Sequence, residues 1–351
     1  MRCARFLPLT ALWLACVRPP AAGPAAEPVL EPQSSGTSVL LQAVSAVSDS
    51  LAWVSGHRGM YARTTDGGRT WHIGRVPDAD SLQFRDVHAV DAQTAWLLSA
   101  GPGALSRIYH TTDGGATWSE QFRNAEPEAF YDCFAFWDRR RGVVFSDQVN
   151  GRMIIRTTSN GGKDWTLVPH ESLPQGLPGE GGFAASGTCV VARPGGHAWI
   201  VTGNGPRSRV LHSADYGRTW SVADAPIVAG EAAGFATIAF RDDRHGVALG
   251  GELGNPDART DNVFLTTDGG RTWLAGGRPP FSGAVYGAAF VPGASPALVA
   301  VGPRGAAWSR NGGESWAALD TLSYWGIGFG PGRVGWITGP GGRITKVTLV
   351  R

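Results

Sequence analysis

The stretch Thr65-Asp66-Gly67-Gly68-Arg69-Thr70-Trp71 decides the fold, because close variants of it recur along the chain. A second copy runs from Thr112 to Trp118, and four further variants end at Trp165, Trp220, Trp273 and Trp316. Each tryptophan follows its Asp or Asn by five residues, and successive tryptophans are 47, 47, 55, 53 and 43 residues apart. Periods of this length are typical of the four-stranded blades of a β-propeller.

The residue types of this turn indicate a structural role. An Asp or Asn side chain accepts hydrogen bonds from backbone N–H groups of its own turn, and the glycines adopt positive φ without steric penalty. The tryptophan then covers the hairpin, so truncating one buried tryptophan would cost about 3–5 kcal/mol. We therefore interpret these turn residues as structural rather than catalytic: Asp66, Trp71, Asp113, Trp118, Asn160, Trp165, Asp215, Trp220, Asp268, Trp273, Asn311 and Trp316.

A second pattern, in which an apolar strand leads through a short gap into another apolar strand, occurs seven times. The seventh copy, residues 324–349, has no aspartate turn and no room for a fourth strand. Residues 28–38 are left over and would supply that outer strand, since closing the ring removes exposed sheet edges. The sequence thus predicts an all-β fold. It is a seven-bladed β-propeller of four-stranded blades, closed by an N-terminal strand in the last blade.

The N-terminus has the order of a bacterial secretion signal: arginines, an apolar stretch, then small residues. The apolar stretch is too short to span a bilayer. Cleavage near Ala25 or Ala26 would release a soluble protein, whereas cleavage before Cys16 would leave a cysteine for lipid attachment. We expect a signal over 1–26, a linker and closing strand over 27–38 and the propeller over 39–351. The protein would be periplasmic or secreted, and lipid-anchored in the second case.

The composition excludes several classes of protein. Fourteen tryptophans and 50 glycines argue against a disordered chain and against a coiled coil. The signal carries three arginines and no acidic residue, so the rest of the chain has 28 basic and 29 acidic residues. That near balance gives no reason to expect a nucleic-acid partner.

Two cysteines remain beyond the signal, Cys133 and Cys189. They have no zinc-type spacing. They occupy the same position in adjacent repeat units, where Cα atoms are usually farther apart than the roughly 7 Å limit for a bridge. We therefore expect two buried free thiols.

The aspartate turn resembles the Asp-box of the BNR repeat, which is found in sialidase-like propellers. Its combination with a Gly-Trp-like strand is more similar to the photosystem II stability and assembly factor family of seven-bladed propellers and its bacterial relatives. The resemblance covers roughly residues 39–349, and it is specific for fold but not for function. It implies that ligands meet the loops entering each inner strand and the loops between second and third strands, with the aspartate turns on the opposite rim.

Arginines and aromatic residues occupy those ligand-facing loops. These arginines can be explained without a binding role: the chain has only two lysines, Lys163 and Lys346, so arginine is its ordinary basic residue. The alternative is a basic, aromatic-lined face that holds carboxylates or phosphates of a partner. The candidate partner-binding residues are Arg58, Arg85, Tyr131, Asp132, Tyr286, Arg304, Tyr324, Trp325 and Arg343.

Two longer loops stand out. Residues 251–262 contain Glu252, Asp257 and Asp261, whose spacing matches no EF-hand, so we expect a solvated loop and no metal. Residues 166–182 are rich in Pro and Gly and would form either a mobile flap or a partner-binding arm.

These patterns favour a non-enzymatic exported propeller without a cofactor that docks onto a protein or membrane complex. The family resemblance implies an assembly or stability factor, or an accessory subunit, of a photosynthetic complex. The alternative is a sialidase-like glycoside hydrolase or a carbohydrate-binding propeller. A glycosidase needs two carboxylates about 5–10 Å apart, and Asp86 and Asp132, on neighbouring inner strands, are the pair that could serve.

Overall fold

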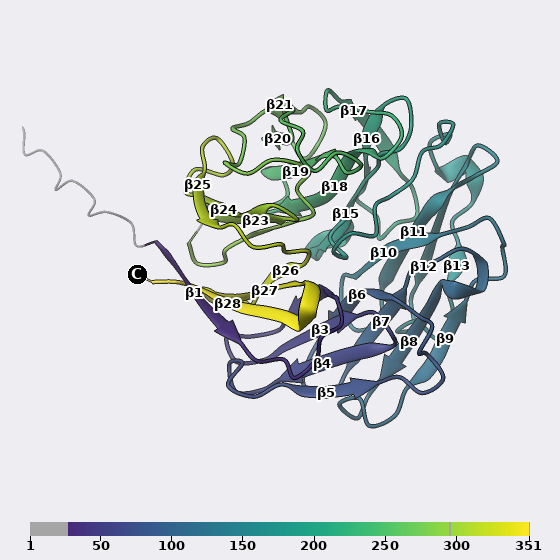
Figure 1. Ribbon diagram of the computed structural model, residues 1–351. Coiled ribbons are helices and arrows are strands. Elements are labelled where there is room, and N and C mark those ends of the chain that lie inside the picture. The colour runs from purple at the N-terminus through teal and green to yellow at the C-terminus, as the bar shows by residue number, and fades with distance from the viewer. Residues whose placement is uncertain (1–26, 295, 351) are drawn as a thin grey trace, which may run out of the picture.

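Seven antiparallel sheets surround a central channel in the computed structural model, which describes residues 27–294 and 296–350 (Figure 1). Each sheet is a blade of four strands, and the inner strands of neighbouring blades contact one another around the ring. This confirms the predicted seven-bladed propeller. The expected signal, with Cys16, Ala25 and Ala26, lies outside the described residues.

The blades follow chain order. Blade 1 contains β2 (Leu41–Ala46), β3 (Ala52–Gly56), β4 (Met60–Thr64) and β5 (His72–Arg75), and blade 2 contains β6 (Phe84–Ala89), β7 (Ala95–Ser99), β8 (Arg107–Thr111) and β9 (Ser119–Arg123). Blade 3 contains β10 (Tyr131–Phe136), β11 (Gly142–Val149), β12 (Arg152–Thr158) and β13 (Thr166–Leu167), and blade 4 contains β14 (Val190–Arg193), β15 (His197–Val201), β16 (Ser208–Ser213) and β17 (Ser221–Ala225). Blade 5 contains β18 (Ala233–Phe240), β19 (Gly246–Glu252), β20 (Val263–Thr266) and β21 (Leu274–Ala275). Blade 6 contains β22 (Gly287–Phe290), β23 (Leu298–Gly302), β24 (Gly305–Ser309) and β25 (Ala317–Asp320).

Blade 7 joins the two ends of the chain. It contains β26 (Ile327–Phe329), β27 (Val334–Gly339), β28 (Arg343–Leu349) and, as its outer strand, β1 (Pro28–Gln33). The pairing of β1 with β28 is antiparallel and runs from Pro28 opposite Leu349 to Gln33 opposite Ile344. Figure 1 shows these strands side by side, purple against yellow. The predicted closure by an N-terminal strand is confirmed.

The only helical segments in the described ranges are short 3-10 turns. They are η1 (Gly103–Leu105), η2 (His170–Ser172), η3 (Pro194–Gly196) and η4 (Pro340–Gly342). Among the same residues, no helix has the length and apolarity needed to cross a membrane.

The aspartate turns join neighbouring blades. In the turn of blade 1, Asp66 Oδ1 accepts from Thr70 N at 2.9 Å and Asp66 Oδ2 from Thr70 Oγ1 at 2.7 Å, and these bonds lower the pKa of Asp66 to about 2. Gly68 has φ +83°, and a Cβ there would lie 2.1 Å from Gln33 Oε1 of blade 7. The turn therefore needs glycine both for its backbone and for contact with the next sheet.

Tryptophans on the second strands complete these contacts between blades. Trp96 Nε1 donates to Gly161 O in the turn of blade 3 at 3.0 Å, and Trp199 Nε1 donates to Gly269 O in the turn of blade 5 at 2.8 Å. Four such residues are at most 1% exposed: Trp53, Trp96, Trp199 and Trp336. The tryptophan richness of the chain thus serves the packing of one blade on another.

Candidate functional site

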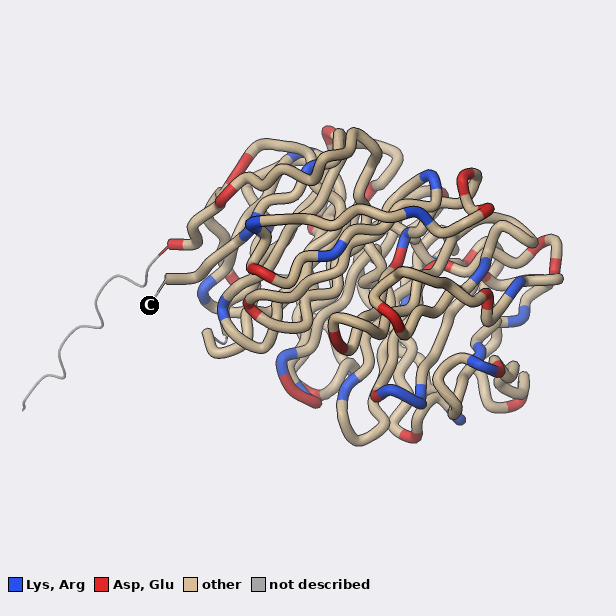
Figure 2. The backbone as a smooth tube through the Cα atoms, turned by 90° about the horizontal axis from the view of Figure 1, so that it is seen from below, with Lys and Arg blue, Asp and Glu red and all other residues tan. Residues whose placement is uncertain are grey.

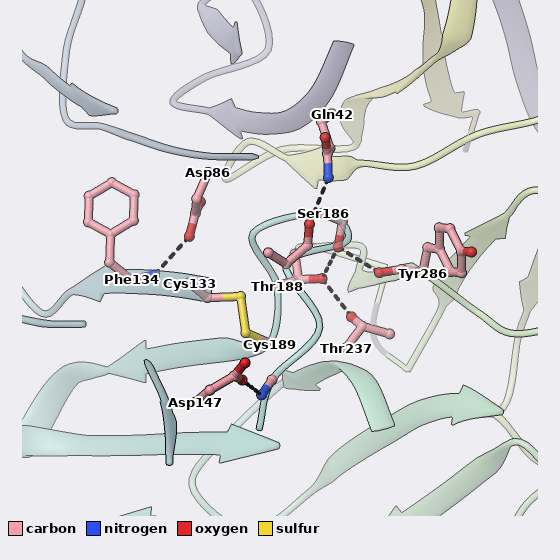
Figure 3. The surroundings of a disulfide bond; sticks show 12 residues. Gln42, Asp86, Cys133, Phe134, Asp147, Ser186, Thr188, Cys189, Thr237 and Tyr286 are labelled. Atoms are coloured by element: carbon pink, nitrogen blue, oxygen red, sulfur yellow. Dashed lines mark hydrogen bonds between the residues drawn. A yellow bond between two sulfur atoms is a disulfide. The ribbon is translucent and has the colours of Figure 1, made fainter. Parts of the chain in front are cut away.

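Residues 180–189, which we call the channel plug, lie among the inner strands of the ring, and Figure 3 shows Ser186, Thr188 and Cys189 of this segment between strands of different blades. Its backbone and side chains bond to blades that are far apart in sequence. Gln42 Nε2 of blade 1 donates to Ala184 O at 2.7 Å, and Ser186 Oγ donates to Tyr286 O beside blade 6 at 2.6 Å. The hydroxyl groups of Thr188 and Thr237, the latter in blade 5, lie 2.7 Å apart.

The remaining plug contacts depend on glycines. Gly181 pairs with Gly203 of blade 4 through two backbone hydrogen bonds, and Gly182 N donates to Asp147 Oδ1 of blade 3 at 2.9 Å. A Cβ on Gly187 would lie 2.2 Å from Asp86 Oδ1 of blade 2. The plug thus contacts six of the seven blades.

A buried ion pair holds the start of the plug. Arg209, in β16, donates from Nε to Glu180 Oε1 at 2.8 Å and from Nη2 to Glu180 Oε2. Thr202 Oγ1 donates to the same Glu180 Oε1 at 2.8 Å, and Leu177 N donates to Oε2 at 2.9 Å. The side chains of Glu180 and Arg209 are 0% and 6% exposed. Both charges are therefore compensated inside the fold.

The sequence left the 166–182 loop as either a mobile flap or a partner-binding arm. The structure packs the last residues of this loop, 180–182, together with the residues up to Cys189 against the inner strands, and a flap or partner-binding role of residues 166–179 stays a prediction. Small side chains such as Gly182, Ala184 and Ser186 allow this close packing against the inner strands.

The prediction of two free thiols is wrong, because Cys133 and Cys189 form a disulfide bond with a Cα–Cα distance of 5.9 Å. Two local features bring the cysteines together. β10 has a bulge between Tyr131 and Cys133, and a bulge bends its strand. Cys189 lies one residue before β14, at the end of the plug rather than within the strand. The bond fixes the plug to blade 3, as Figure 3 shows.

Replacing both cysteines by alanine is expected to lower the free energy of unfolding by about 2–4 kcal/mol, since the bond closes a long loop in the unfolded chain. The sequence separation is 56 residues. Urea unfolding without reductant measures this loss. As a control, the parent chain unfolded with reductant should match the double variant. The parent chain can be alkylated first and reduced afterwards. If its mass does not change on reduction, the disulfide bond is absent.

The carboxylates suggested for glycoside hydrolysis lie beneath the plug. Asp86 is 4% exposed and accepts from Phe134 N and Val87 N, and Asp132 is 1% exposed. Burial raises the pKa of both carboxyl groups well above the usual value, and for Asp132 the charge of Asp147 adds to the effect. Burial also raises the pKa of Asp147 to about 6.

This arrangement does not favour Asp86 and Asp132 as the carboxylate pair of a glycosidase. The two carboxyl groups are almost fully buried, and Gly187 and Gly182 of the plug pack closely against Asp86 and Asp132. A general acid or base must come within hydrogen-bond distance of the atom it serves. The raised pKa values therefore come from burial under the plug, and they identify no accessible catalytic pair.

Three of the candidate arginines lie on consecutive blades of the predicted docking face. Arg304 is in the β23–β24 loop of blade 6, Arg343 begins β28 of blade 7, and Arg58 is in the β3–β4 loop of blade 1. Arg58 is exposed, and it makes no ion pair with any described residue. Arg304 Nη2 lies 2.9 Å from Asp257 Oδ1, and Arg343 Nη1 donates to Ser323 O at 2.6 Å.

The candidate aromatic residues divide into two groups. Tyr286 and Trp325 are partly exposed and form a T-shaped pair with centroids 5.0 Å apart at the channel mouth. Tyr131 and Tyr324 are buried at 1% and 0% exposure. With Asp132, these two lie below the surface, so they are not placed to contact a docking partner directly.

Buried Tyr324 and half-buried Arg85 have partners within the protein. Tyr324 OH donates to Asp320 Oδ2 at 2.7 Å, and burial raises the pKa of Tyr324 to about 12. Arg85 donates from Nη2 to Gln83 Oε1 at 2.6 Å and lies 5.8 Å from the Phe130 ring centroid. Burial lowers the pKa of Arg85.

A broad hollow opens on this face between blades 6 and 7, with a volume of about 890 Å³. Its walls come from the 34–38 linker, the β27–β28 hairpin and the loop entering blade 7, including Leu322 and Arg343. Asp320 lines both this hollow and a smaller one of about 320 Å³ that reaches Arg304. Sequence reasoning missed the serines of the linker, although small polar residues directly before an inner strand were a usable signal.

Charge over the whole molecule is mixed. Figure 2 shows basic and acidic residues interspersed around the ring. In the 251–262 loop, Asp257 pairs with Arg304, and Asp261 lies 4.0 Å from Arg278. Any attraction of a charged partner must therefore be local rather than a property of the whole surface.

Comparisons with known proteins agree with this architecture. The YCF48 structure bound to a D1 peptide has a TM-score of 0.63 and 17% identity, over 92% of this chain and 97% of that one. YCF48 from Cyanidioschyzon merolae has a TM-score of 0.64 and 17% identity, over 92% of this chain and 99% of that one. The WD40 propeller domain of Doa1 has a TM-score of 0.58 and 13% identity, over 92% of this chain and 98% of that one. At these identities the likeness concerns the fold.

One curated relative also matches in sequence. A sialidase from Micromonospora viridifaciens is 25% identical over 241 residues, which are 56% of this chain and 34% of that protein. The chain thus matches about a third of the sialidase. No protein-family model matches. The chain is a seven-bladed propeller that resembles the YCF48 photosystem II assembly factors in fold and a bacterial sialidase over part of its sequence.

Proposed function

We propose that the chain is a non-enzymatic exported propeller that docks onto a protein partner with the face formed by blades 6, 7 and 1. The observation that carries this proposal is the grouping of Arg304, Arg343 and Arg58 on three consecutive blades, where Arg343 lines the hollow of about 890 Å³ and Arg304 lines the smaller one. The Tyr286–Trp325 pair lies beside the channel plug, where Ser186 bonds to Tyr286 O. Arginine and large aromatic residues contribute most of the binding energy at protein interfaces.

Fold-level likeness supports a protein as the partner. A YCF48 propeller has been solved with a D1 peptide, and YCF48 is a photosystem II assembly factor. By analogy, the present chain is an assembly or stability factor, or an accessory subunit, of a photosynthetic or other membrane complex. It acts from the periplasmic side, either as a secreted protein or attached through a lipid at Cys16.

Changing Arg58, Arg304 and Arg343 together to alanine is expected to reduce co-purification with the partner complex. The loss should be several-fold at low salt and smaller at high salt, because charges at the edge of an interface mainly speed association. Quantitative mass spectrometry of complexes isolated from native membranes gives the measurement.

A matched control changes Arg69, Arg218 and Arg271 to alanine. These exposed arginines lie in aspartate turns on the opposite rim, so the net charge changes equally without altering the docking face. Equal losses for both variants would indicate bulk electrostatics. Undiminished co-purification of the first variant would assign docking to another face.

The sialidase relative favours a second candidate function, glycoside hydrolysis. The buried positions of Asp86 and Asp132 weigh against it. Assays with fluorogenic sialosides and aryl glycosides distinguish the two functions. Robust turnover that is abolished by Asp86→Asn would replace the docking proposal.

A further inference from the structure

A second concave site lies across the ring from the docking arginines, at the junction of blades 2 and 3. It has a volume of about 440 Å³ and is lined by β12, the β11–β12 hairpin and the loop entering blade 3. Pockets of this size hold small organic molecules. Its residues belong to neither the plug nor the hollow between blades 6 and 7.

The floor of this pocket is apolar. Val149, Met153 and Val168 line it and are 7%, 3% and 4% exposed. Leu167, at the edge, is 49% exposed, which is unusual for a leucine with an apolar pocket beside it. An apolar group of a ligand would cover this leucine and gain burial against the floor.

A partly buried guanidinium stands at the polar side of the pocket. Arg156 Nε donates to Tyr131 OH at 2.7 Å, Nη1 donates to Trp165 O at 3.2 Å, and Cζ lies 5.5 Å from the Phe122 ring centroid. All these partners are neutral. Within the described part of the chain, Nη2 has no hydrogen-bond acceptor and Arg156 has no ion pair.

The contrast with Arg209 shows what Arg156 lacks. Arg209 is buried and has its charge matched by Glu180. Burying a charge without a partner is costly, so a shielded guanidinium normally has a carboxylate or phosphate beside it. Exposed Arg152 adds positive charge at the rim, where Glu126 opposes it; His170 and Tyr131 are the remaining titratable groups of the lining. The inner part of the pocket is therefore positive and the rim is mixed.

We propose that this pocket binds a monocarboxylate that carries an apolar substituent. The carboxylate lies against Arg156 Nη2, and the substituent covers Val149, Met153 and Leu167. A planar guanidinium with free N–H groups fits a carboxylate well, and the apolar floor disfavours a highly charged ligand. This site lies beyond the proposed docking function and does not depend on it.

Phenylacetate is the first probe, with neutral phenylacetamide as its matched control. Calorimetry or chemical-shift titration should show binding of the acid and at least tenfold weaker binding of the amide. Arg156→Met should weaken phenylacetate binding roughly 10-fold to 100-fold, the range expected for a lost charge-assisted hydrogen bond. Glu126→Gln should strengthen it about two- to fivefold, by removing a rim repulsion.

The two variants are expected to change the affinity for phenylacetate in opposite directions. Damage to the fold cannot explain both results, because a misfolded protein would not bind more tightly. Melting curves identify any variant that fails to fold, and Glu126→Gln then decides alone. A peptide ending in Phe, with a free or an amidated C-terminus, reveals whether the carboxylate comes from a polypeptide or a free acid. Equal binding of acid and amide, or no binding of either the acid or the free-ended peptide, would overturn the proposal.

Discussion

Replacing Glu180 by alanine is expected to lower the free energy of unfolding by about 3–5 kcal/mol, which is the effect of breaking a buried ion pair from one side. Arg209, with a side chain 6% exposed, would lose two hydrogen bonds and its counter-charge together. Thr202 Oγ1 and Leu177 N would lose their acceptor as well. Urea unfolding followed by tryptophan fluorescence measures the change.

The same substitution should release the plug before the ring unfolds. Glu180 directly precedes Gly181, whose backbone bonds join the plug to Gly203. Hydrogen exchange should therefore lose protection first in residues 176–188, whereas the inner strands stay protected. Uniform loss of protection would mean that the plug and the ring form a single cooperative unit.

Two controls separate the charge from the packing. Asp224→Ala breaks an exposed pair with Arg207, at 2.7 Å and with side chains 51% and 58% exposed, so it should cost less than about 1 kcal/mol. The double change Glu180→Leu with Arg209→Met replaces the buried pair by apolar side chains and should restore most of the stability. If Glu180→Ala lowered the free energy of unfolding no more than Asp224→Ala does, the buried pair would contribute little to stability.

The repeat pattern was enough to predict the ring. A turn with a fixed Asp-to-Trp spacing can be read from sequence because its chemistry is local: Asp66 bonds Thr70 four residues on. The closing strand could also be predicted, since the last repeat lacked a fourth strand while residues 28–38 were unassigned. Local geometry and strand counting thus account for the architecture.

The plug could not be predicted, because nothing local specifies it. Residues such as Gly181, Gly182 and Gly187 are typical of a flexible loop, and only contacts with six blades fix them. The sequence did carry one signal for its anchor. Arg209 lies among Ser208, Val210 and Leu211 in a strand, at a position that β alternation assigns to the protein interior. A buried arginine needs a partner, and Glu180 is the nearest acid before it in sequence.

The candidate docking residues were predicted by loop position, which does not determine side-chain direction. Arg58 and Arg304 reach the surface, whereas Tyr131 and Tyr324 turn inward beside Arg156 and Asp320. The bulge in β10 shifts Asp132 and Cys133 relative to a regular strand. One displaced residue is enough to turn a predicted contact residue into a buried one.

Deleting residues 27–38 is expected to cost more than about 4 kcal/mol, since it opens the ring and leaves buried donors without acceptors. Gln33, the last residue of β1, is the central contact. Its Oε1 accepts from Trp71 Nε1 of blade 1 at 3.0 Å and from Trp336 Nε1 of blade 7 at 3.1 Å. Its Nε2 donates to Gly67 O at 3.3 Å. One side chain thus joins the first blade to the last.

Point variants test whether closure depends on this side chain or on the strand alone. Gln33→Leu keeps the strand but leaves two indole N–H groups unpaired, so it should cost about 2–4 kcal/mol. Glu31→Ala, in the same strand, removes only a long contact of 3.9 Å with Lys346 and should change stability by less than about 1 kcal/mol. Unfolding curves of the three variants should therefore rank the deletion as the most damaging, then Gln33→Leu, then Glu31→Ala. A deletion that leaves the melting temperature unchanged would show that the ring is stable with blade 7 open, because the remaining six blades and three strands would then suffice for the fold.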